Sequence, residues 1–221
     1  TPLYSSAASD VYKRQPLMER VAREEKVEPE YIRQGLARGE IVIPKNGKRA
    51  LERPVAIGTG LRTKVNANIG TSTDYPHLEE ELLKAEEAIE AGADTIMDLS
   101  TGGDLAQVRR ALLERCPLPF GTVPIYEAAI EAAREEGALT KLKPDEIFEV
   151  IERQAEDGVD FMTVHCGVTR GTLDRLKLEG RVTDIVSRGG SFLICWMVAN
   201  ERENPLYEQF DRLLEIARSY D

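Results

Sequence analysis

Polar side chains recur at alternate positions in one short apolar segment of this sequence. In KVNANIG, the alternation of a strand places Lys64, Asn66 and Asn68 on one face and the apolar residues on the other. Where the inner face of a barrel strand serves only to fill the core, it carries Val, Ile or Leu. Amides and an ammonium on that face therefore indicate a ligand cavity. The alternative is an edge strand with one face in water.

A histidine follows another apolar run. In FMTVHCG the same alternation groups Phe161, Thr163 and His165, so if Cys166 faces the covering helices, His165 faces the ligand side. An imidazole at the carboxyl end of a parallel strand lies where barrel enzymes build their sites. We therefore predict that Asn68 and His165 point into one cavity.

Other segments could orient a substrate or hold an anion. VSRGGS offers the Ser187 hydroxyl, the Arg188 guanidinium and the Gly189 amide, which together suit a phosphate. VPIYEA places the Tyr126 hydroxyl at a strand end. The turn in MDLSTGGD could bind an anion or equally cap a helix.

The elements that must position these residues alternate along the chain. Strands are predicted at Thr63 to Ile69, Asp94 to Leu99, Phe120 to Ile125, Phe161 to Cys166 and Val182 to Ser187. Helical spacing of apolar residues appears at Leu78, Leu82, Ala85 and Ile89, and again at Ile147, Val150, Ile151 and Ala155. A last helix is predicted from Pro205 to Tyr220. Alternating strands and helices indicate an α/β protein with a parallel sheet.

The first 60 residues have a different character. Residues 1–15 read as a non-native leader, because their Ser/Ala tract is unlike the charged text that follows. Residues 16–60 predict a small α/β amino-terminal cap, with two short helices from Pro16 to about Gly39 and two short strands in IVIPKN and RPVAIGTG.

Two architectures fit the remaining residues 61–221. An open doubly wound sheet and a closed barrel both bind ligands at the carboxyl ends of their strands. The open sheet usually has a G-x-G-x-x-G turn, and none follows the first strand here. A full (βα)8 TIM-type barrel takes about 250 residues. We therefore expect a partial barrel of about five βα units, truncated before closure.

The charge of the chain limits the kinds of molecule it is expected to bind. The chain carries 29 Lys and Arg against 39 Asp and Glu, a net charge of −10, which argues against nucleic acid and membrane surfaces. No apolar run approaches the roughly 20 residues of a bilayer span, and no secretory pattern opens the chain. We expect a cytoplasmic protein that binds a small molecule. Three widely spaced cysteines predict buried small hydrophobes and no metal site: Cys116, Cys166 and Cys195.

With these segments assembled, the chain resembles the phosphomethylpyrimidine synthase family of the radical S-adenosylmethionine class. Six phrases carry the resemblance, in order from Gly60 to Asp211: GLRTKVNANIGTS, ADTIMDLSTGGD, GTVPIYEA, DFMTVHCGV, IVSRGGSF and ENPLYEQFD. The resemblance implies a carbon–carbon lyase of thiamine biosynthesis. Its reaction would convert 5-aminoimidazole ribotide to 4-amino-2-methyl-5-phosphomethylpyrimidine (hydroxymethylpyrimidine phosphate), through a 5′-deoxyadenosyl radical made at a 4Fe-4S cluster.

The resemblance also implies the substrate contacts. Seven residues match the family's substrate-binding positions: Asn68, Met97, Tyr126, His165, Ser187, Arg188 and Gly189. Met97 on pattern alone would be a core residue. Arg188 could instead pair with an acidic neighbour, Asp184 or Glu179.

Family features of the carboxyl side have no counterpart here. They are a D-G-L-R-P-G loop, two zinc-ligand histidines and the C-x-x-C-x4-C cluster motif, and His77 is no zinc candidate because it has no partner histidine. We therefore expect half of the substrate site, no ligands for the cluster or zinc, and no activity in this chain alone. A homodimer is implied for the full-length enzyme.

Two other functions stay open. An aldolase on the same barrel would use Lys64 as a Schiff-base amine or rely on acid-base chemistry. A silent phosphate-binding fragment would keep the anion site without any chemistry.

Overall fold

The computed structural model describes residues 16–220 as a mixed α/β protein with ten α-helices, a two-stranded sheet and a four-stranded sheet in that range. The predicted leader, residues 1–15, lies outside the described residues. The chain divides into two compact units. The first holds the described residues up to Thr122, residues 155–161 and those from Ala217, and the second holds 123–154 and 162–216.

The amino-terminal part of the first unit confirms the two helices and two short strands. Helices α1 (Pro16–Glu25) and α2 (Pro29–Arg38) pack on β1 (Ile41–Val42), which pairs antiparallel with β2 (Ile57–Gly58). Pro29 stands in the first turn of α2, where its missing N–H costs no hydrogen bond. The core of this part is apolar throughout: Met18, Val21, Ala22, Ile32, Ile41 and Ala56.

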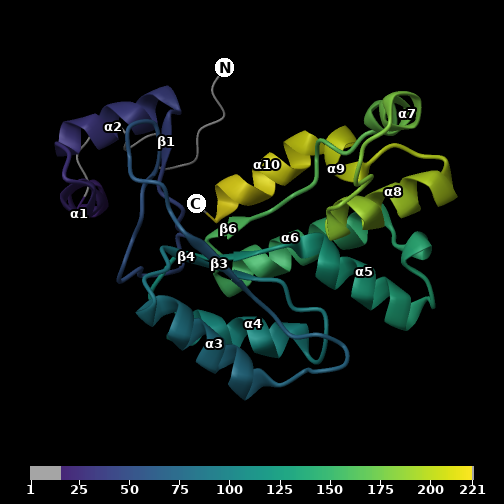
Figure 1. The fold of residues 1–221 in the computed structure, drawn as a ribbon, viewed down its shortest axis with the longest axis horizontal. Helices are drawn as coiled ribbons and strands as arrows, with labels where there is room; N and C mark the ends of the chain where they lie inside the picture. Colours follow the sequence, from purple (N-terminus) through teal and green to yellow (C-terminus); the bar gives the residue numbers. More distant parts are fainter. Residues whose placement is uncertain (1–15, 221) are drawn as a thin grey trace. The chain divides into compact units, whose positions relative to one another are not determined.

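The four-stranded sheet has the order β3-β4-β5-β6, formed by β3 (Asn66–Ile69), β4 (Thr95–Asp98), β5 (Phe120–Thr122) and β6 (Phe161–Met162). β3 pairs parallel with β4, and β4 with β5. Helices α3 (Leu78–Glu90) and α4 (Leu105–Arg115) lie side by side along the sheet (Figure 1). The predicted strands here and the α3 spacing are confirmed, although each strand is shorter than predicted.

One predicted strand is wrong. Val182–Ser187 forms a turn and irregular chain between α7 (Arg170–Glu179) and α8 (Arg188–Asn200). Its β-branched residues gave a strand signal, but Val182 and Val186 are exposed and the segment pairs with no described strand. Intrinsic preference was outweighed because a strand is stable only with a partner.

The third predicted strand ends early. β5 stops at Thr122, and Pro124 begins helix α5 (Pro124–Glu135). Proline cannot donate to a strand ladder and is favoured in the first helical turn. Tyr126 therefore lies in the first turn of α5 and not at a strand end, which corrects the prediction.

The second unit is mainly helical. The helices after α5 are η2 (Leu139–Lys141), α6 (Pro144–Asp157, whose last residues belong to the first unit), α7, α8, α9 (Pro205–Glu208) and α10 (Phe210–Ser219). The predicted last helix is thus two helices, with Gln209 between them. The indole of Trp196 in α8 donates to the Leu142 carbonyl at 2.6 Å, which ties α8 to the segment after η2. Within residues 16–220 no helix is long and apolar enough to cross a membrane.

A buried carboxylate anchors the segment after β1 to the sheet. Asp160 accepts from the backbone amides of Asn46 and Phe120, both at 2.9 Å, and pairs with Arg49. The Asn46 side chain donates to the Ala155 carbonyl at 2.7 Å. Burial raises the pKa of Asp160, despite the bonds that favour its charged form.

Candidate functional site

Asn68 and Met97 lie next to each other on one face of the sheet. They are paired in register on β3 and β4, and Met97 is paired in turn with Gly121 on β5. Paired residues of parallel strands point to the same face, whereas the next residue, Asp98, points to the other. The Asp98 carboxylate interacts with Arg109 of α4, so Asn68 and Met97 lie on the face away from that helix.

The shared face of Asn66 and Asn68 is confirmed by their side chains. Asn66 Nδ2 donates to Asn68 Oδ1 at 3.3 Å, and Thr95 Oγ1 donates to Asn66 Oδ1 at 2.7 Å. Further along the same face a Cβ on Gly121 would lie 2.3 Å from the Phe161 ring, so any larger residue there would have to displace the ring. Asn68 is exposed and Met97 is buried.

Lys64 precedes β3, and its side chain contacts α1. Its ammonium pairs with Glu25 Oε1 at 2.5 Å and donates to the Arg62 carbonyl at 2.6 Å, and its side chain is 5% exposed. An ammonium engaged in this way is not the free amine of a Schiff-base aldolase. The structure gives that alternative no support.

The second unit gathers His165 and the Ser-Arg-Gly triplet at the start of α8. Ser187 is the N-cap residue, and its Oγ accepts from the Gly190 amide at 3.2 Å. His165 Nε2 lies 2.9 Å from the same Oγ. A Cβ on Gly189 would lie 2.3 Å from the imidazole, so this glycine lets the ring pack directly on the helix terminus.

Tyr126 joins this cluster through Arg188. The Arg188 guanidinium lies 5.1 Å from the centre of the Tyr126 ring, within range of a cation–π contact. Arg188 makes no ion pair within residues 16–220, and Glu179 pairs with Arg175 at 2.9 Å instead. The alternative that Asp184 or Glu179 neutralises Arg188 is therefore not what the structure shows.

His165 keeps unused hydrogen-bonding capacity. Burial lowers the pKa of its imidazole, so the ring is uncharged at neutral pH. Its Nδ1 is a buried side-chain atom without a hydrogen-bond partner in the described part of the chain. Since buried polar groups are nearly always paired, this nitrogen has the capacity for a further hydrogen bond. His165 itself follows β6 by three residues, so strand alternation does not set its direction.

The sequence interpretation missed Asn204. This buried residue donates from Nδ2 to the carbonyls of His165 at 2.9 Å and Val168 at 2.8 Å. Its Oδ1 also accepts from the Leu206 amide at 3.0 Å as the N-cap of α9. The Asn-Pro pair before a short helix is an N-cap signal that could have marked it.

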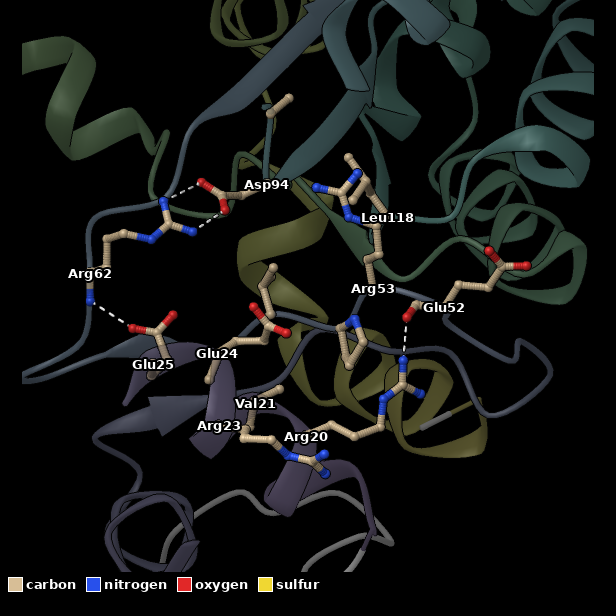
Figure 2. Close-up of a pocket in the computed structure, with 14 residues that line it drawn as sticks. Arg20, Val21, Arg23, Glu24, Glu25, Glu52, Arg53, Arg62, Asp94 and Leu118 are labelled. Carbon is tan, nitrogen blue, oxygen red and sulfur yellow. Dashed lines mark hydrogen bonds and ion pairs between the residues drawn. The ribbon is translucent and has the colours of Figure 1, made fainter. Parts of the chain in front are cut away.

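A pocket of about 280 Å³ lies at the other end of the sheet's strands. Its lining includes Asp94, which directly precedes β4, and Leu118, which precedes β5, whereas Asn68 and Met97 lie toward the carboxyl ends. Figure 2 shows Arg62 in this pocket, paired with Asp94. It is therefore separate from the Asn68 and Met97 face.

Comparisons with known proteins show what this chain is similar to. A family model described as the radical SAM ThiC family matches residues 5–221. The phosphomethylpyrimidine synthase of Desulforudis audaxviator is 60% identical over 206 residues, covering 93% of this chain and 48% of that protein. That of Moorella thermoacetica is 59% identical over 204 residues, covering 92% and 47%. The 5-hydroxybenzimidazole synthase BzaB of the same organism is 53% identical over 206 residues, covering 93% and 48%.

The chain spans about half the length of the curated relatives it matches. A radical SAM family implies S-adenosylmethionine and an iron–sulfur cluster, which is held by cysteine thiolates. Within residues 16–220, no group of three or more His, Cys, Asp or Glu side chains could hold a metal ion, so these residues do not fit the cluster. The prediction of three buried cysteines is wrong in part, because Cys116 is buried, Cys166 half-buried and Cys195 exposed.

Proposed function

Since this chain belongs to the radical SAM ThiC family, we propose that it forms part of the substrate site of a phosphomethylpyrimidine synthase. The reaction would convert 5-aminoimidazole ribotide to 4-amino-2-methyl-5-phosphomethylpyrimidine in thiamine biosynthesis. The observation that carries the proposal is the cluster at the start of α8, where Tyr126, His165, Ser187, Arg188 and Gly189 meet.

The phosphate of the ribotide fits the α8 terminus. The Arg188 and Gly189 amides have no acceptor in the described residues, and a helix start with free amides favours an anion. Arg188 adds a charge that no carboxylate of residues 16–220 neutralises. The uncharged His165 ring and the Ser187 hydroxyl then orient the substrate by hydrogen bonds.

Asn68 and Met97, on the sheet, are the other two proposed substrate contacts. Asn68 offers an exposed amide and Met97 an apolar thioether beside it. The shared cavity of Asn68 and His165 stays a prediction. The residues of this chain bind and orient, and no radical step is assigned to them.

Several finer features complete the proposal. They are a partial (βα)8 barrel after an amino-terminal cap, a carbon–carbon lyase class, a zinc site formed by residues other than these, a cytoplasmic location and a homodimer. The isolated chain should bind no iron–sulfur cluster and cleave no S-adenosylmethionine. Anaerobic reconstitution with iron and sulfide, followed by a 5′-deoxyadenosine assay, tests that expectation, and product formation would contradict it.

Substrate binding tests the central claim. Arg188→Ala in the complete enzyme should weaken ribotide binding by about tenfold or more, the loss of one charge-assisted hydrogen bond. The loss should shrink for the riboside that lacks the phosphate, while Arg188→Lys keeps the charge and serves as the control. Titration calorimetry of both ligands on the three proteins measures this, and equal losses for the two ligands would show that Arg188 does not read the phosphate.

The product distinguishes the two activities named among the relatives. The proposed function requires a phosphorylated pyrimidine, whereas the BzaB relative is named for 5-hydroxybenzimidazole. Mass spectrometry of the reaction products separates the two. A benzimidazole product would overturn the proposed reaction. The proposed ribotide-binding site would then be retained only if the enzyme still binds the ribotide.

A further inference from the structure

The loops that follow β3 and β4 touch along their backbones. Gly70 has a φ of +150°, and a Cβ there would lie 2.6 Å from the Ser100 nitrogen. A Cβ on Gly102 would lie 2.0 Å from the Ser72 carbonyl oxygen. Neither contact leaves room for a side chain, so two glycines make the close approach possible.

Thr71 joins the two loops. Its backbone amide donates to Ser100 Oγ at 3.0 Å, and its carbonyl accepts from the Thr101 amide at 2.9 Å. Its Oγ1 donates to the Gly102 carbonyl at 2.7 Å and lies 3.4 Å from the Gly102 amide, which donates back. We call these contacts of Thr71 with Ser100, Thr101 and Gly102 the Thr71 bridge.

The Thr71 bridge is buried, and two buried carboxylates accept hydrogen bonds from backbone amides beside it. Thr71 is 3% exposed and Ser100 is 7% exposed. Asp98 Oδ1 accepts from the Ser100 amide at 2.9 Å, and Glu81 Oε2 of α3 accepts from the Gly70 amide at 2.8 Å. Both carboxylates are themselves buried, so water cannot easily replace a lost bond.

We propose that Thr71 is a positioning residue, which fixes Asn68 and Met97 side by side for substrate by joining the loops that follow their strands. Asn68 lies three residues before Thr71, and Met97 lies three residues before Ser100. The bridge therefore sets the relative position of β3 and β4 at the ends where the two candidate contacts lie. This inference rests on the proposed function, because it assumes that Asn68 contacts the ribotide.

The Thr71 hydroxyl offers a matched set of variants. Thr71→Val keeps the shape of the side chain but leaves the Gly102 carbonyl and amide without their partner. Thr71→Ser retains the hydroxyl. Thr73→Val makes the same change two residues along the same loop, where the side chain is exposed. All are made in the complete enzyme, and ribotide affinity is measured well below each unfolding midpoint.

Thr71→Val should weaken ribotide binding about tenfold, since misplacement of a contact is costly even when the contact itself remains. Thr71→Ser and Thr73→Val should stay within about twofold of the wild type. In an Asn68→Ala background, Thr71→Val should add less than about twofold, because residues that act through one contact are not additive. A purely structural role would instead give the same loss in both backgrounds.

Unchanged affinity in Thr71→Val, or a full additional loss in the Asn68→Ala background, overturns the positioning role while leaving the proposed function intact. A wild-type enzyme that binds no ribotide overturns both. If Thr71→Val does not fold, Ser100→Ala removes the acceptor of the Thr71 amide and should show the same loss and the same non-additivity.

Discussion

The candidate site residues on the sheet, Asn68 and Met97, differ from those at the start of α8 in how the polar groups around them are hydrogen-bonded. Around Asn68 and Met97, the polar groups of the supporting loops are buried and bonded to one another, as in the Thr71 bridge. At the start of α8, three polar groups have no hydrogen-bond partner within residues 16–220, namely His165 Nδ1 and the backbone amides of Arg188 and Gly189. Buried groups that are bonded within the protein mainly fix the backbone, whereas polar groups without a partner can accept a ligand directly.

This contrast predicts which substitutions affect ligand binding alone and which also affect the stability of the fold. Changes at the α8 terminus should affect ligand binding more than folding, since Ser187 and Arg188 are exposed. Changes in the loops after β3 and β4 should affect both. The following four substitutions test the contrast, beginning with the largest expected effect.

Gly189→Ala should weaken ribotide binding about a hundredfold, because the new methyl group displaces the His165 ring. Gly171→Ala is a matched control, since each glycine is the second residue of its helix and follows an arginine. Among the described residues, the atom nearest to a Cβ on Gly171 is Thr169 Oγ1, at 3.8 Å. Calorimetric titration of both variants decides, and equal affinities would contradict the assigned contact between Gly189 and His165.

Gly102→Ala should lower the free energy of unfolding by about 2 kcal/mol, because its methyl group meets backbone that cannot yield easily. Gly92→Ala faces open space but has a φ of +91°, so it should cost only about 1 kcal/mol of backbone strain. Denaturant titrations compare the two. A smaller loss in Gly102→Ala than in Gly92→Ala would show that the two loops are not in close contact.

Asp98→Asn should change how stability depends on pH. Burial raises the pKa of Asp98 from 3.8 to about 6, against its bonds to Ser100 and the charge of Arg109, while Glu81 raises it further. A carboxyl group whose pKa is raised in the folded state contributes stability that is fully present below pH 3.8. This contribution is lost as the pH rises through about 6. The variant should therefore gain stability relative to the wild type across that window, and a pH-independent difference in denaturant midpoints would contradict the buried carboxyl.

Arg175→Ala should have the smallest effect. Arg175 and Glu179 form an exposed pair in α7, with side chains 76% and 65% exposed, and such pairs contribute less than about 1 kcal/mol. Neither residue belongs to either candidate set. Ribotide affinity should be unchanged, and a clear loss in titration calorimetry would extend the α8 cluster to α7.

Most elements could be predicted from local pattern, and the failures have identifiable causes. Helices α1, α2 and α3 follow directly from apolar spacing and from proline at a helix start. The false strand at Val182–Ser187 shows the limit of that reasoning, because a β-branched segment becomes a strand only when another strand pairs with it. VPIYEA predicts Tyr126 at a strand end, but Pro124 begins a helix there, because proline suits the first helical turn and not a strand ladder.

The candidate site divides in the same way. The sequence by itself determined which residue types stand at Asn68, Met97, His165 and the Ser-Arg-Gly triplet, and the strand alternation that groups Asn66 with Asn68. Only the tertiary structure decided that Gly189 admits the His165 ring, that Asn204 holds the His165 carbonyl, and that Thr71 joins two loops. The reason is physical: alternation and capping act over a few residues, whereas these contacts depend on backbone segments that are distant in sequence and approach within a hydrogen bond's length.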